Sequence, residues 1–158
     1  MSDHIATLLE ETAELRAAIP GEAPAGSDVS FEPEFEKIKG EVDKLSNLEG
    51  GEVDWYLVVE RAGDLLKTQT KDLRLAVWLT AGGLQRSGWR GFVRGLVVCR
   101  ALITDFWEPL LPKRDRARSN IVVWLAEQAI GKVTELPVRL SDGDDVRAAV
   151  DLVDEIDG

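Results

Sequence analysis

Apolar side chains recur at three- and four-residue steps along most of the chain, which is the spacing of one face of an α-helix. Residues 3–19 carry the first such stripe, and a Pro-Gly pair ends it. Residues 20–30 are rich in turn-forming residues and predict a loop. A second helix is expected to begin with Ser30 as its cap and to continue to about Leu45.

The strongest helical pattern lies in the middle of the chain. Asp54 is placed to cap a helix whose amphipathic stripe continues to Gln69. Thr70 then predicts the cap of a helix over 73–81, which is apolar nearly all the way round. Because such helices are usually buried on several sides, we expect this one to be the central helix of the domain.

Further helices are predicted after this central segment. Residues 85–91 predict a turn, 92–107 a long helix, and 113–118 a charged loop. Ser119 predicts the cap of a helix that closes at Gly131. The pattern therefore continues to alternate between helices and short connections.

The C-terminal part predicts a short extended stretch, 136–140, and a last helix over about 142–156. No stretch shows the sustained period-two alternation of a half-buried strand. The fold class is therefore all-α, and the length favours a single compact domain, 1–158, of about seven helices.

The net charge of −10 is unevenly distributed along the chain. Residues 1–64 have a net charge of −11, residues 65–138 of +6, and residues 139–158 of −5. This polarity indicates either a basic binding face or mutual neutralisation across the folded surface, and the pattern alone favours neither. The overall acidity predicts that nucleic acid is not the main partner, because that binding neutralises phosphates.

The composition favours a soluble, cytoplasmic protein. Cys99 is the only cysteine, so no disulfide framework can form within the chain. Acidic residues among the first twenty positions exclude a signal peptide. No apolar run reaches the length of about 20 residues that a membrane-spanning helix needs, so direct membrane insertion is not expected.

Groups that could perform catalysis are sparse in the sequence. His4 is the only histidine and lies near the terminus, while Cys99 lies in an apolar run without a base. The carboxylates show no metalloprotease or calcium-loop spacing. Gly88, Gly91 and Gly95 lack the spacing of a phosphate-binding loop and predict close helix packing instead. We therefore expect no enzyme, no catalytic residue, no metal site and no cofactor.

Basic residues around a tryptophan are the candidates for a docking surface. Trp89 lies in a glycine-rich turn between two arginines, and an exposed tryptophan flanked by arginine is typical of a protein interface. The candidate docking residues are Trp89, Arg90, Arg94, Arg86, Arg114 and Arg116. In contrast, Trp55, Trp78 and Trp107 are predicted to lie in the core, since tryptophan buries a large area.

Three stretches in this order resemble the N-terminal, ImpA-type domain of the TssA family of type VI secretion. They are the loop 24–28, the block 54–79, which contains the sequence T-K-D-L-R, and the glycine-spaced segment 88–112. The resemblance covers about 20–130. The residues that match the family's motifs, which are expected to be mostly structural, are Asp54, Trp55, Leu66, Thr70, Lys71, Asp72, Leu73, Arg74, Trp78, Leu79, Gly91, Gly95, Trp107 and Pro112.

The resemblance implies a non-catalytic scaffold that helps to build the baseplate and contractile sheath-tube of the secretion machine. The expected partners are other type VI secretion components, and self-association is a further expectation. Members of the family carry a ring-forming C-terminal domain after this one, so ring assembly is not carried over to these 158 residues. The alternative is a regulatory or small-molecule-binding helical domain, or an enzyme whose carboxylates converge only in the fold. A deep pocket lined by acids would favour that alternative.

Overall fold

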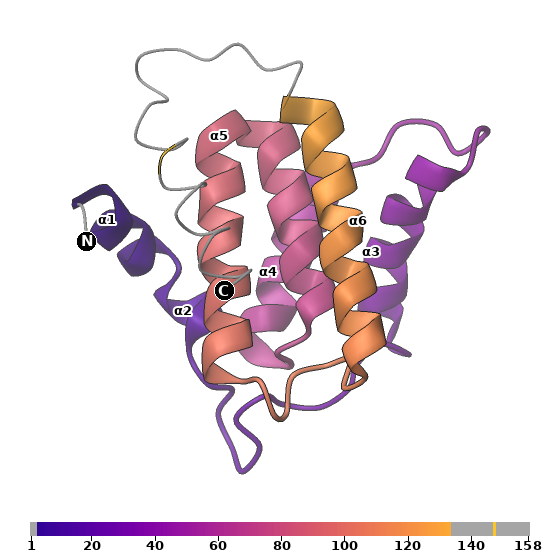
Figure 1. The fold of residues 1–158 in the computed structure, drawn as a ribbon. Helices are drawn as coiled ribbons and strands as arrows, with labels where there is room; N and C mark the ends of the chain where they lie inside the picture. The colour runs from indigo at the N-terminus through magenta and orange to yellow at the C-terminus, as the bar shows by residue number, and fades with distance from the viewer. Residues whose placement is uncertain (1–2, 134–146, 148–158) are drawn as a thin grey trace.

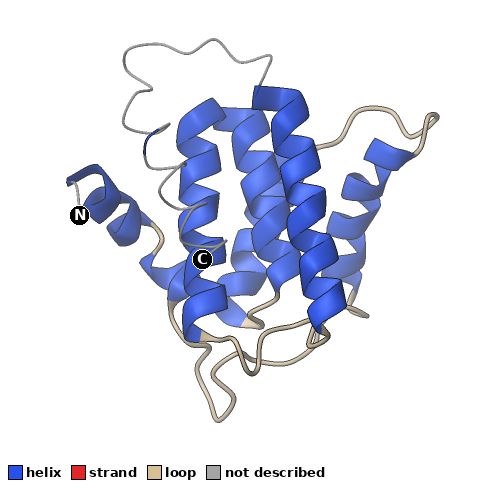
Figure 2. Ribbon diagram, viewed as in Figure 1, coloured by secondary structure: helices blue, strands red, loops and turns tan. Residues whose placement is uncertain are grey.

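The computed structural model describes residues 3–133 and 147. These residues form six α-helices and one short 3-10 helix, and none of them forms a strand (Figure 2). The elements are α1 (Asp3–Glu11), α2 (Ala13–Arg16), α3 (Pro33–Asp43), η1 (Lys44–Ser46), α4 (Trp55–Thr68), α5 (Leu73–Asp105) and α6 (Asp115–Val133). The all-α prediction is confirmed, with six helices rather than about seven. The predicted stretch 136–140 and the predicted helix over 142–156 lie outside the described residues, apart from residue 147.

The bundle is centred on α5, which reverses direction along its length (Figure 1). Gly88 has φ 62° and ψ −138°, so it is not helical, and it divides the element into a first half, 73–87, and a second half, 89–105. Glycine adopts this positive φ without steric cost. The predicted turn at 85–91 is therefore correct only at Gly88, because the residues on either side are helical. The two halves lie antiparallel and side by side.

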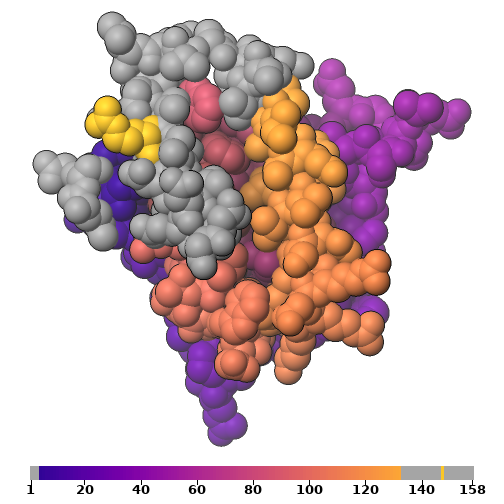
Figure 3. All heavy atoms as spheres, viewed as in Figure 1, coloured from indigo at the N-terminus to yellow at the C-terminus, as the bar shows by residue number. Residues whose placement is uncertain are grey.

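The other helices pack around this hairpin. α4 packs mainly on α5, α3 packs on α4, and α6 packs on α5. In the space-filling view, α6 covers much of one face of the molecule, and α3 lies beyond it at the edge (Figure 3). α1 and α2 lie on the opposite side of the bundle from α3 (Figure 1).

Glycines let the two halves of α5 approach one another closely. A Cβ atom added to Gly83 would lie 2.5 Å from the carbonyl oxygen of Gly91. A Cβ atom on Gly95 would lie 2.5 Å from the Cα atom of Thr80. These separations are too short for any side chain, which confirms the prediction of close helix packing for Gly91 and Gly95. The prediction is wrong for Gly88, where an added Cβ would meet nothing within 4 Å and the positive φ of the reversal is what requires glycine.

The predicted central helix is buried as expected. Its buried residues are Leu73, Leu75, Ala76, Val77, Leu79, Thr80 and Ala81. Trp78 is partly buried and contacts Phe35 of α3, with ring centroids 5.4 Å apart. Trp55 is also partly buried against the core. The core prediction is wrong for Trp107, which is 44% exposed because α5 ends at Asp105.

The N-terminal helices begin and end at other residues than predicted. Residues 3–19 do not form one helix, since α1 and α2 are separated at Thr12, whose hydroxyl donates to Leu8 O (2.8 Å). A threonine bonded back to the preceding turn favours a bend at this point. Ser30 does not cap α3, because Glu32 precedes its first turn, and the Ser30 amide instead donates to Asp28.

The caps of the later helices confirm one prediction and correct two. The Asp54 carboxylate accepts from the Leu57 amide (3.1 Å) and caps α4 as predicted. Asp72, rather than Thr70, caps α5, because its Oδ1 accepts from the Arg74 amide (2.9 Å). α6 begins at Asp115 rather than near Ser119, so most of the predicted charged loop is helical.

The close contact between the halves of α5 predicts that Gly91→Ala destabilises the domain by about 1–3 kcal/mol, the usual cost of overpacking. The added methyl would meet the Gly83 backbone, which cannot move without separating the two halves. Urea denaturation followed by circular dichroism measures the change in the free energy of unfolding.

Gly40→Ala is the matched control, since a Cβ there meets nothing within 4 Å and lies inside α3. That variant is expected to gain roughly 0.5–1 kcal/mol from helix propensity. Equal midpoints of urea denaturation for the wild type and Gly91→Ala would contradict the close contact between Gly83 and Gly91.

Candidate docking surfaces

A surface hollow lies between α4 and the reversal of α5, and we name it the arginine hollow. Its volume is about 420 Å³. It is lined by Val59, Glu60, Leu79, Gly83, Arg86, Ser87, Arg90, Gly91, Arg94 and Gly95. The hollow brings together three of the six predicted docking residues, all of them arginines.

The reversal at Gly88 places these arginines around one site. Arg86 comes from the first half of α5, whereas Arg90 and Arg94 come from the second half. Arg90 and Arg94 are about 6 Å apart along the helix axis, since an α-helix rises about 1.5 Å per residue. Three glycines at the same site contribute no side chain to fill the space between them.

The three guanidinium groups differ in their partners. Arg86 lies over the Tyr56 ring, 4.7 Å from its centroid. Arg90 donates to Glu11 of α1 (2.6 Å), and both side chains of this pair are well exposed. Arg94 forms no hydrogen bond or ion pair among the described residues. An exposed ion pair contributes only about 0–1 kcal/mol, so Arg90 can exchange Glu11 for another carboxylate. Arg94 has no such pair to break, and both arginines are therefore available to a further ligand.

The remaining predicted docking residues lie elsewhere. Trp89 is partly buried and packs edge-on against Phe92, with ring centroids 6.4 Å apart, so the expectation of an exposed indole is corrected. Its indole N–H is buried and finds no acceptor within the described ranges. Arg114 and Arg116 are exposed near the start of α6, at the opposite end of the bundle from Gly88 (Figure 1). The six residues therefore do not form one continuous surface.

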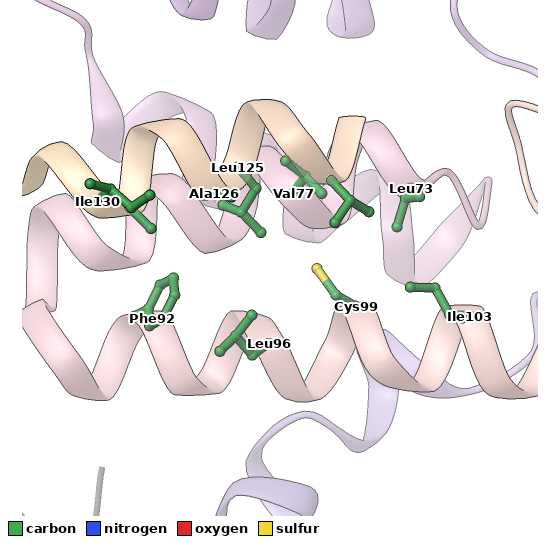
Figure 4. Close-up of a pocket in the computed structure, with 11 residues that line it drawn as sticks. Leu73, Val77, Phe92, Leu96, Cys99, Ile103, Leu125, Ala126 and Ile130 are labelled. Carbon is green, nitrogen blue, oxygen red and sulfur yellow. The ribbon is translucent and has the colours of Figure 1, made fainter. Parts of the chain in front are cut away.

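A second cleft lies between α5 and α6 and is apolar. Its volume is about 250 Å³. Figure 4 shows residues of the second half of α5 facing residues of α6 across the cleft. It is lined by Leu73, Val77, Phe92, Leu96, Cys99, Ile103, Val122, Leu125, Ala126, Ala129 and Ile130. No carboxylate is among these residues, so this cleft differs from the acid-lined pocket that an enzyme of the alternative kind would need.

The lone thiol in this cleft is poorly suited to nucleophilic chemistry. Burial raises the pKa of Cys99 to about 11, and its sulfur lies 3.3 Å from the Thr80 hydroxyl. At neutral pH the thiol is therefore protonated, whereas the thiolate is the reactive form. The described residues also contain no group of three or more histidine, cysteine, aspartate and glutamate side chains that could hold a metal ion. No helix among them is long and apolar enough to cross a membrane.

The T-K-D-L-R stretch lies at a buried junction. Lys71 is fully buried, and its ammonium donates to Leu15 O (2.8 Å) and Leu66 O (2.5 Å). These carbonyls belong to the last turns of α2 and α4, where the helix dipole favours a positive charge. The ammonium also lies 5.9 Å from the centroid of the Phe106 ring. Desolvation by burial lowers the pKa of Lys71 to about 8.

The backbone of Lys71 holds two further segments, and we name the whole arrangement the Lys71 junction. Its amide donates to Ala25 O (2.7 Å), and its carbonyl accepts from the Leu111 amide (3.3 Å). Gly26 belongs to the first of these segments, with φ 72°, and any Cβ there would collide with the Gln69 backbone. The loop 24–28 and the block 54–79 therefore meet in space.

A buried ion pair lies beside this junction. Asp72 accepts from Arg74 at 3.0 Å and 2.7 Å, and the Arg74 guanidinium lies 4.8 Å from the centroid of the Phe35 ring. Burial raises the pKa of Asp72, and the hydrogen bonds from Arg74 oppose that shift. The pair connects the start of α5 with α3, which supports the structural role expected for this motif.

Arg118 fixes the segment between α5 and α6. It was predicted in a charged loop, but it is 5% exposed and lies in α6. Its guanidinium donates to Leu110 O and Pro112 O, both at 2.7 Å, and covers the Trp107 ring at 4.2 Å. Trp107 and Pro112 are thus structural without belonging to the core.

Several residues of the arginine hollow were not predicted from the sequence. Glu60 lines the hollow from α4, and two residues beside it, Glu11 of α1 and Tyr56 of α4, contact Arg90 and Arg86 from parts of the chain far away in sequence. No local motif marks them.

The described residues form a small helical domain with a charged surface hollow and buried motif residues. The chain belongs to the family of ImpA N-terminal domains of the type VI secretion system, whose family model matches residues 16–127. This membership confirms the resemblance found in the sequence.

One solved structure also resembles the chain closely. It is the N-terminal domain, including the ImpA_N region, of the TssA component of the type VI secretion system from Burkholderia cenocepacia. It is 29% identical, with a TM-score of 0.69, and the match covers 92% of this chain and 68% of that chain. No curated protein matches the sequence.

The burial of Lys71 predicts that loss of its proton makes the folded domain more stable as the pH rises. Its pKa in the folded state is about 8, below the ordinary value of 10.5, so between these values the unfolded chain binds more protons than the folded one. From pH 7 to pH 9.5 we expect the free energy of unfolding of the wild type to gain about 2 kcal/mol relative to Lys71→Met. Urea denaturation of both proteins at the two pH values measures this difference.

Comparison with Lys71→Met removes the contribution of other groups that titrate in the same range. If the two proteins change in parallel between the two pH values, Lys71 does not titrate as its burial predicts.

Proposed function

We propose that this chain is a non-catalytic protein-docking domain of a type VI secretion assembly protein and that it acts in the cytoplasm. The arginine hollow is the observation that carries the proposal. It offers three guanidinium groups at the surface of a domain whose family belongs to this secretion system. Arginine is enriched at protein interfaces, where its rigid set of donors fits carboxylates.

The geometry favours docking over the alternative of a small-molecule or catalytic domain. Small-molecule sites combine an apolar enclosure with a few convergent polar groups that orient the ligand. The apolar cleft between α5 and α6 has no charged lining residue, and the arginine hollow lies at the surface beside exposed Arg86 and Ser87. A contact with another polypeptide suits this arrangement better than capture of a metabolite.

The proposed partners are baseplate or sheath-tube proteins of the same machine, and self-association is a second route of docking. Arg86, Arg90 and Arg94 form the first candidate contact area. Arg114 and Arg116 form a separate one near the start of α6. Trp89 contributes by supporting the reversal of α5, since it packs on Phe92.

A photo-crosslinking amino acid tests this function in cells with an active type VI system. At Ser87, which lines the arginine hollow, we expect adducts with a baseplate or sheath-tube protein. The same amino acid at Glu127, exposed on α6, is the matched control and is expected to give fewer adducts. Mass spectrometry of the purified full chain identifies the adducts.

Cells that lack the secretion genes give the background for this measurement. If only the position of Glu127 gives adducts with a secretion component, the docking function stands but the docking surface lies on α6. If neither position yields a secretion component, the proposed function fails.

A further inference from the structure

The arginine hollow carries a positive charge on an acidic protein. Three arginines and one glutamate, Glu60, line it, whereas the chain as a whole has a net charge of −10. Glu60 forms no ion pair with these arginines. The hollow is therefore a local site of attraction for negative groups.

The chain itself shows which negative group fits there. Glu11, which is 79 residues away from Arg90 in sequence, places its carboxylate 2.6 Å from that guanidinium. The contact is exposed on both sides, so a carboxylate of another molecule can exchange with it. Arg94, one helical turn further along, is left with its donors unused among the described residues.

The shape of the hollow is fixed by its glycines. Side chains at Gly83, Gly91 and Gly95 would collide with the opposing half of α5, so no larger residue can fill the space between the arginines. A ligand that enters meets backbone below it and guanidinium groups beside it.

We propose that the arginine hollow binds an acidic segment of a partner protein, which presents two carboxylates about 6 Å apart to Arg90 and Arg94. This inference rests on the proposed docking function and names the chemistry of the partner. Two acidic residues one turn apart on a helix, or two apart on an extended strand, have this spacing. Each carboxylate accepts charge-assisted hydrogen bonds, and Arg86 adds a third positive charge at the rim.

Nucleic acid is a poorer fit for the same site. No aromatic residue is among those that line the hollow, so bases have no ring on which to stack. The strongly negative chain also repels a continuous phosphate backbone over longer distances.

Fluorescence polarisation with the full chain and a labelled hexaglutamate peptide tests the proposal, and hexaglutamine is the uncharged match. Arg90→Gln and Arg94→Gln are each expected to weaken binding about tenfold, which corresponds to the loss of one charge-assisted contact. Arg61→Gln is the matched control and leaves binding unchanged, since Arg61 is an exposed arginine that pairs with Glu34 of α3 and does not line the hollow.

Two other variants are expected to strengthen binding, a result that misfolding cannot produce. Glu60→Gln removes the negative charge from the hollow, and Glu11→Gln releases Arg90. Both are expected to strengthen hexaglutamate binding by about threefold, the scale of an exposed ion pair.

Equal affinities of Arg94→Gln and Arg61→Gln would overturn the proposal, as would oligothymidylate of the same charge that binds as tightly as hexaglutamate. These failures differ from failure of the docking function. Secretion components crosslinked at Ser87 or Glu127, together with no role for Arg90 and Arg94 in peptide binding, would leave that function standing and reject this inference.

Discussion

The buried ammonium of Lys71 is the interaction on which the packing of four separate segments depends. A charge removed from water is costly unless it is paired or fully hydrogen-bonded, and Lys71 has two carbonyls and an aromatic ring as its partners. These partners come from α2, α4 and the segment after α5, while its backbone holds the loop 24–28 and Leu111. Displacement of α2 or α4 would remove one of the two carbonyls that hold the charge. The cost of burial thus couples their positions, and the lowered pKa of Lys71 is a consequence of the same burial.

This junction also fixes the start of α5 and thereby the place of the arginine hollow. Asp72 caps the helix directly after Lys71, and its pairing with Arg74 sets the orientation of the first turn against α3. Arg86 lies about 20 Å further along the axis, by the rise of an α-helix. The hollow therefore forms at the end of the bundle opposite the junction. One end of α5 is held by buried polar contacts, and the other presents its charged side chains to solvent.

The local pattern of the sequence was sufficient for most helices and for part of the site. Asp54 caps its helix as predicted because a cap depends on neighbours three residues away. Thr70 and Arg118 were misplaced because their burial depends on residues from other segments, which no local spacing reveals. Trp107 was placed in the core on its size alone, although a guanidinium from α6 covers it at the surface. The arginines of the hollow were candidates because they lie near Trp89 in the sequence, whereas Glu11 and Glu60 come near the hollow only through the fold.

The fold shows one of the two roles that the sequence left open for the uneven charge of the chain, and the proposed docking site corresponds to the other. Acidic residues of the N-terminal part do neutralise basic residues of the middle, as in the pairs Glu11–Arg90 and Glu14–Lys67. At the arginine hollow this neutralisation is incomplete, because Arg90 pairs with Glu11 whereas Glu60, the carboxylate among the lining residues, forms no ion pair with the arginines. Arg94 therefore remains without a hydrogen bond or ion pair among the described residues.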